Sequence, residues 1–104
     1  MKNKVPPGLK TPYEIQSDKT LSAIQKDLLA AVVQLHQVCG VCFASNGYLA
    51  DWLGMPEDTV VRNLVKLEKM SRISKKLYRD KKGAITKREM VPVGYHRRKA
   101  GGGG

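Results

Sequence analysis

Apolar residues recur at helical spacing through the first half of the chain. The longest such pattern predicts an amphipathic helix over residues 23–38, with its apolar positions at Ile24, Leu28, Ala31, Val32, Leu35 and Val38. Ser22 and Gln25 have the spacing of a capping box. In this motif the serine hydroxyl accepts a hydrogen bond from the backbone amide of the glutamine, and the glutamine side chain accepts one from the backbone amide of the serine. Gly40 is expected to end this helix.

Two shorter helices are predicted next, joined by a tight turn at Gly54. The apolar run Val41–Ala44 predicts a brief strand before them, and Ser45 is placed to cap the first, whose apolar residues are Tyr48, Leu49, Trp52 and Leu53. Pro56 suits the start of the second, which is predicted to reach about Met70 with a buried stripe at Val60, Leu64 and Leu67. Two short helices around such a turn are typical of a helix-turn-helix.

The periodicity then changes to that of strands. Residues 73–79 and 85–93 are strand-like, and the DKKGA stretch between them contains a turn residue, Gly83, which together predict a β-hairpin. A hairpin directly after a helix-turn-helix is a wing. The predicted fold is mainly α with a β-hairpin, a winged helix-turn-helix of three helices, a short strand and a two-stranded wing over residues 20–93. Residues 1–19 are predicted to be a flexible leader, and residues 94–104 a basic and then glycine-rich tail.

The net charge of +10 changes this picture because it is unevenly distributed. Residues 69–99 contain twelve basic and two acidic side chains, whereas residues 20–68 carry a net charge of −2. A basic segment on a predicted hairpin favours a polyanionic partner, and double-stranded DNA is the expected one. We expect phosphate contacts from Lys75, Lys76, Arg79, Lys81, Lys82, Lys87 and Arg88 on the wing, and from Ser45 and Asn46 at a helix start.

The last predicted helix has a polar face opposite its buried stripe. A turn of ~100° per residue places Thr59, Arg62, Lys66 and Lys69 on that face, with Asn63 at its border. Arginine pairs with guanine and asparagine with adenine in the major groove, so we expect this face to read bases. An ordinary solvated face and simple helix capping are the alternative interpretations of these residues.

The phrase CFASNGYLADWLGM and the stretch TVVRNLVKLEKMSRI resemble the winged helix-turn-helix domains of plasmid and phage replication initiators and replisome organisers. The resemblance covers roughly residues 20–93 and is carried by Ser45–Asn46, Leu49–Ala50, Gly54, Thr59–Val60 and Leu67–Glu68–Lys69. It implies DNA binding in replication initiation or its regulation. Two positions depart from the family pattern, the acidic pair Glu57–Asp58 and the apolar pair Val61 and Val65. A winged-helix transcriptional repressor fits the same sequence.

A third interpretation is a winged-helix protein-interaction adaptor that contacts a partner or a second copy through Val61 and Val65. The chain has no apolar run long enough to span a membrane, no secretory signal and no disulfide framework, so we expect it in the cytoplasm. No nucleophile–base constellation or phosphate-cradling loop stands out, and we expect neither enzymatic activity nor a cofactor. A structural zinc site requires four ligands, and His36, Cys39 and Cys42 supply only three. We therefore interpret these residues as ordinary packing residues.

Overall fold

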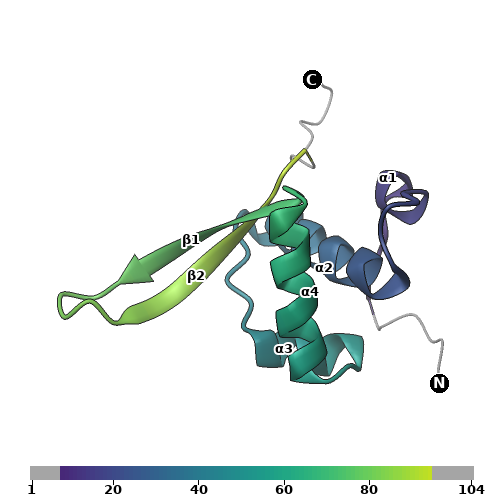
Figure 1. Ribbon diagram of the computed structural model, residues 1–104. Coiled ribbons are helices and arrows are strands. Elements are labelled where there is room, and N and C mark those ends of the chain that lie inside the picture. Colours follow the sequence, from purple (N-terminus) through teal and green to yellow (C-terminus); the bar gives the residue numbers. More distant parts are fainter. Residues whose placement is uncertain (1–7, 95–104) are drawn as a thin grey trace.

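The computed structural model describes residues 8–94 and places four helices ahead of a two-stranded antiparallel hairpin. The elements are α1 (Tyr13–Gln16), α2 (Ala23–Cys39), α3 (Asn46–Leu53), α4 (Glu57–Lys69), β1 (Ile73–Arg79) and β2 (Ile85–Pro92). The helices pack together, and the hairpin projects well beyond them (Figure 1). This small α+β domain is compatible with a winged helix, with one helix more than predicted.

Helix α2 forms the centre of the domain. The predicted capping box is present, since Ser22 Oγ accepts from the Gln25 amide at 3.2 Å and Gln25 Oε1 accepts from the Ser22 amide at 2.9 Å. The six consecutive residues 28–33 are all buried, so the middle of α2 is enclosed on every side rather than along one stripe. The predicted stripe fails at both ends, where Ile24 is 39% exposed and Val38 is 74% exposed, because the ends of the helix run past the core.

Helices α3 and α4 meet at a tight turn, as the glycine predicted. Gly54 ends α3 in the left-handed region with φ of 68°, and Pro56 is the N-cap of α4. The predicted core face of α4 is confirmed, because Val60, Leu64 and Leu67 are all buried. This pair of helices therefore packs its apolar sides against α2 and leaves the opposite side of α4 open to solvent.

The segment from Val41 to Ala44 does not form the predicted strand. It runs beside β2 and makes one backbone hydrogen bond to it, from the Met90 amide to the Cys42 carbonyl at 2.8 Å. A strand needs a repeated ladder of such bonds, and a single one does not provide it. The apolar character of the segment instead reflects the burial of Cys42 in the core.

The two strands of the hairpin pair in register from Ile73 opposite Pro92 to Tyr78 opposite Lys87. An irregularity after Tyr78 shifts the pairing, so that Arg79 lies opposite Ile85. The root of the hairpin is part of the core, because Ile73, Met90 and Pro92 are buried. The outer half is largely exposed, which leaves a two-stranded ribbon anchored at one end.

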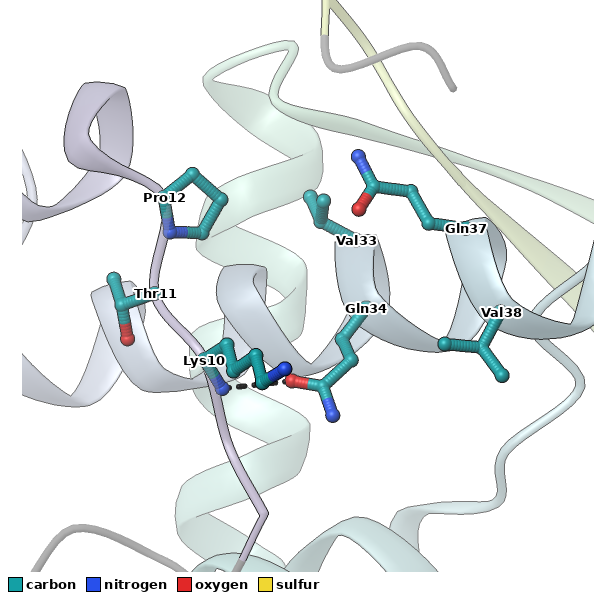
Figure 2. Close-up of a pocket in the computed structure, with 7 residues that line it drawn as sticks. All are labelled: Lys10, Thr11, Pro12, Val33, Gln34, Gln37 and Val38. Atoms are coloured by element: carbon teal, nitrogen blue, oxygen red, sulfur yellow. Dashed lines mark hydrogen bonds between the residues drawn. The ribbon is translucent and has the colours of Figure 1, made fainter. Parts of the chain in front are cut away.

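Residues 8–19 do not form the flexible leader that was predicted for residues 1–19; residues 1–7 lie outside the described part. Gln34 on α2 holds this segment at two points, accepting from the Lys10 amide and donating to the Gly8 carbonyl, each at 2.7 Å. Figure 2 shows Lys10, Thr11 and Pro12 running past α2. The side chain of Ile15 on α1 is fully buried in the core. The domain therefore begins earlier than residue 20.

Candidate nucleic-acid interface

The seven predicted phosphate-contacting residues of the wing all lie on the hairpin. Five of them are exposed, namely Lys76, Arg79, Lys81, Lys82 and Lys87. The other two are half-buried and already engaged with protein groups: Lys75 with Glu68 at 3.2 Å, and Arg88 with the segment before α3. The hairpin thus presents five exposed cations. Lys75 and Arg88, the other two predicted phosphate contacts, instead help to hold the domain together.

The turn at the tip explains how the cations there stay available. Asp80 is the acidic residue of the turn, and its Oδ1 accepts from the backbone amides of Lys82 at 2.8 Å and Ala84 at 3.0 Å. Arg79 donates to the Gly83 carbonyl at 2.9 Å and closes the turn from the other side. Because the amides of its own loop occupy the Asp80 carboxylate, Lys81 and Lys82 lie exposed at the tip, and neither has an acidic partner within residues 8–94.

Arg88 links the hairpin to the start of α3. Its guanidinium donates to the Ala44 carbonyl at 3.3 Å and to Asn46 Oδ1. Burial lowers the pKa of Arg88 from its ordinary value, although an arginine stays protonated at neutral pH. Asn46 and Arg88 were both predicted to contact phosphate, and here they contact each other. This pairing fixes the position of α3 relative to β2.

Ser45 acts as the N-cap of α3. Its Oγ accepts from the Tyr48 amide at 3.0 Å, which satisfies one of the amides that a helix start leaves without a partner. The capping interpretation of Ser45 is therefore confirmed, and its phosphate contact stays a prediction. Ser45 is exposed at the edge of a shallow groove between α3 and the hairpin, whose other lining residues include Asn46, Gly47, Glu57, Lys75, Leu77, Ile85 and Thr86.

The predicted base-reading residues lie on the polar side of α4. Arg62, Lys66 and Lys69 are exposed, whereas Asn63 is half-buried and donates to the Thr59 carbonyl at 2.9 Å within its own helix. Asn63 and Thr59 are thus joined to each other, and the side-chain amide that would contact adenine is held against the helix backbone.

The position of Glu68 shows how α4 is rotated relative to the hairpin. Glu68 pairs with Lys75 on β1, and Glu57 lines the groove beside Lys75 and Leu77, so this side of α4 faces the hairpin. At ~100° per residue, Arg62, Lys66 and Lys69 lie ~100–160° around the helix from Glu68. The cations of α4 and those of the hairpin therefore do not line a common groove, which periodicity alone did not indicate.

Two aromatic residues belong to the same surface and were not among the predicted site residues. Phe43, from the segment before α3, meets Tyr78 on β1 edge to face, with ring centroids 6.2 Å apart. Lys87 Nζ lies 4.5 Å from the centroid of the Phe43 ring. Since the two rings are 35 positions apart in sequence, only the packing of the Val41–Ala44 segment beside β2 brings them together.

The remaining candidates lie elsewhere. Val61 and Val65 are exposed on neighbouring turns of α4, at 40% and 39%. Cys42 is buried in the core, as the packing interpretation requires, but Cys39 is exposed and that interpretation is wrong for it. No group of three or more histidine, cysteine or acidic side chains within residues 8–94 is placed to hold a metal ion. Residues 95–104 of the predicted tail, including His96, lie outside the described residues.

Comparison of the chain with protein-family models, with curated protein sequences and with solved structures gives no match. None of the helices in residues 8–94 combines the length and the apolar composition that crossing a bilayer requires.

Proposed function

We propose that the chain binds double-stranded DNA as a winged helix, in replication initiation or its regulation in a plasmid- or phage-type element. The observation that carries this proposal is the set of five exposed cations on a hairpin that projects from the helical body. A two-stranded ribbon of this kind can lie along a duplex, where lysine and arginine neutralise phosphates. The replication role is supported by the sequence resemblance alone.

The number of exposed cations on the hairpin determines how steeply salt should weaken the affinity for DNA. Each phosphate neutralised on B-DNA contributes about −0.9 to the slope of log affinity against log salt. The five exposed hairpin cations therefore predict a slope of roughly −4 to −5. Lys75 and Arg88 should add little to this slope, because each is half-buried and engaged with a side chain of a helix.

Helix α4 is proposed as the base-reading element through Arg62, Lys66 and Lys69. These side chains are exposed, and an arginine on such a face can pair bidentately with guanine. The acidic residues Glu57 and Asp58 occupy the first turn of the helix, so phosphates are repelled there. We therefore place the approach to DNA at the middle and last turns of α4.

A fluorescence-anisotropy titration with a random duplex at two salt concentrations tests the proposal. Binding at low salt that weakens steeply as salt rises is the expected result. Absence of binding at low salt would contradict it. Footprinting on origin and promoter fragments then distinguishes a replication role from that of a transcriptional repressor, because both activities would give the same salt dependence.

A second candidate function, an adaptor that binds another protein or a second copy, is favoured by the exposure of Val61 and Val65 side by side on α4. Two valines one helical turn apart form a small apolar strip, which a partner helix can cover. Replacing both with serine would abolish capture of such a partner and leave duplex affinity unchanged. Loss of duplex affinity in that variant would favour a DNA-facing strip instead.

A further inference from the structure

One face of the hairpin carries an aromatic cluster whose rings the duplex-binding proposal does not use. It consists of Phe43 and Tyr78 with the two lysines Lys76 and Lys87. Tyr78 and Lys87 are direct cross-strand neighbours, so their side chains share one face of the ribbon. Arg88 is the next residue along β2 and points to the opposite face, where it contacts Ala44 and Asn46.

The rings of this cluster are fixed in place. The Tyr78 hydroxyl donates to Glu89 Oε1 at 2.9 Å, and the two ring planes meet at 80°. Phe43 is nevertheless 41% exposed, although it is the chain's one phenylalanine. The hairpin is anchored by the fully buried Met90 and by Ile73, so burial of Phe43 is not what holds it.

Each ring of the cluster has a lysine beside it. Lys87 Nζ lies 4.5 Å from the Phe43 centroid and 5.2 Å from that of Tyr78, and Lys76 Nζ lies 5.4 Å from the Tyr78 centroid. The acidic member of this face is Glu89, whose carboxylate accepts the Tyr78 hydroxyl. The exposed residues Arg79, Lys81 and Lys82 extend the positive charge towards the tip.

We propose that this aromatic cluster binds single-stranded nucleic acid, with an unpaired base stacked on Phe43 and with Lys76 and Lys87 on the adjoining phosphates. An aromatic ring beside flexible cations suits a single strand, because every base has a π-face and every linkage a charge. A base within a duplex is already stacked between its neighbours and cannot cover the ring. The stacking contact on Phe43 is therefore separate from the duplex contacts, whereas Lys76 and Lys87 belong to both sites.

The test compares two labelled 12-mers of equal charge by fluorescence anisotropy, one of thymidine and one of abasic nucleotides. The wild-type protein should bind the thymidine strand more tightly. Phe43→Leu, which keeps an apolar side chain but removes the ring, should weaken thymidine binding about five- to tenfold. Its affinity for the abasic strand and for random duplex should stay unchanged. Lys87→Gln should weaken the binding of both single strands, and of the duplex as well, because Lys87 is one of the five exposed hairpin cations.

Equal affinity of the wild-type protein for the two strands would overturn the proposal, as would an equal loss on both strands in Phe43→Leu. If the Phe43→Leu protein unfolds below the assay temperature, the Phe43→Trp protein is used to test the proposal in its place. The Phe43→Trp protein should bind the thymidine strand at least as tightly as the wild-type protein does. The fluorescence of the introduced tryptophan should be quenched by the thymidine strand but not by the abasic strand. Weaker thymidine binding by a folded Phe43→Trp protein would also overturn it. Retained duplex binding by the Phe43 variants separates this result from the duplex proposal.

Discussion

Arg72, in the turn between α4 and β1, forms an ion pair with Asp18, which precedes it by 54 residues and lies between α1 and α2. Arg72 also donates to Thr20 Oγ1 at 3.0 Å, and the Thr20 amide donates to Asp18 Oδ1 at 2.9 Å. These contacts join the N-terminal segment to the root of the hairpin. The packed start of the domain therefore helps to set where the hairpin leaves the helical body.

We expect this ion pair to make stability depend on pH in the acid range. Hydrogen bonds from Arg72 and then from Thr20 hold the pKa of Asp18 well below its usual range. A carboxylate with a lowered pKa stabilises the folded state above its unfolded pKa of about 3.9 and loses that contribution as pH falls further. Asp18→Asn should therefore lower the thermal midpoint at pH 7, and its difference from wild type should narrow below about pH 4.

Circular-dichroism melts between pH 7 and pH 2 measure this difference. Asp51→Asn is the matched control, because Asp51 is exposed on α3 and undergoes the same chemical change. A gap between Asp18→Asn and wild type that stays constant with pH would contradict the assignment.

Ser45 offers a way to separate helix capping from DNA contact. Ser45→Ala should reduce the free energy of unfolding by about 1 kcal/mol, because the Tyr48 amide loses its acceptor. Ser45→Asp should keep most of that stability, since aspartate also caps and suits the helix start. The added charge should weaken duplex binding several-fold. If Ser45→Ala weakens binding without loss of stability, the hydroxyl contacts the phosphate directly.

The tip lysines should contribute affinity without specificity. Replacing Lys81 and Lys82 with glutamine should weaken binding to all duplexes alike and make the salt slope less steep by roughly two. Arg62→Ala should also lower the preference for the best sequence, because a base contact is lost. Anisotropy titrations with matched specific and random duplexes distinguish the two. Equal, sequence-independent losses from both changes would mean that α4 does not read bases.

Ser71 identifies a position where the backbone is strained. It follows α4 with φ of 62°, a left-handed conformation that costs a side chain with a Cβ about 1 kcal/mol. Ser71→Gly should therefore raise the free energy of unfolding by about 0.5–1 kcal/mol, a few degrees in the thermal midpoint. The reverse change at a matched site, Gly54→Ser at φ of 68°, should lower it. A destabilised Ser71→Gly protein would show that the serine side chain has a role of its own.

The sequence was sufficient for the features that depend on neighbouring residues. The capping box at Ser22, the glycine turn at Gly54, the buried stripe of α4 and the hairpin around Gly83 all arise within a few positions of one another. Such signals act through local hydrogen bonds and side-chain spacing, so periodicity and turn chemistry capture them.

The features that sequence patterns missed depend on contacts between distant residues. Nothing near Ile15 indicates that it fills the core, and nothing near Arg88 indicates that Asn46, 42 positions earlier, will accept its hydrogen bond. The pairing of Phe43 with Tyr78 has the same origin. The rotation of α4 relative to the hairpin likewise became visible only through the ion pair of Glu68 with Lys75.

The hairpin that projects from the domain also has an unprotected side. Within residues 8–94, the sheet contains only β1 and β2, and the Val41–Ala44 segment lies along β2, so the outer edge of β1 pairs with no further strand. Leu77 is exposed on β1, and an apolar residue on such an edge favours pairing with another chain. Lys75 and Lys76 on the same strand oppose its pairing with another chain. The charges of the hairpin therefore also guard against aggregation, and acetylation of Lys76, which lies outside the Lys75–Glu68 ion pair, should leave the fold intact while making the protein self-associate.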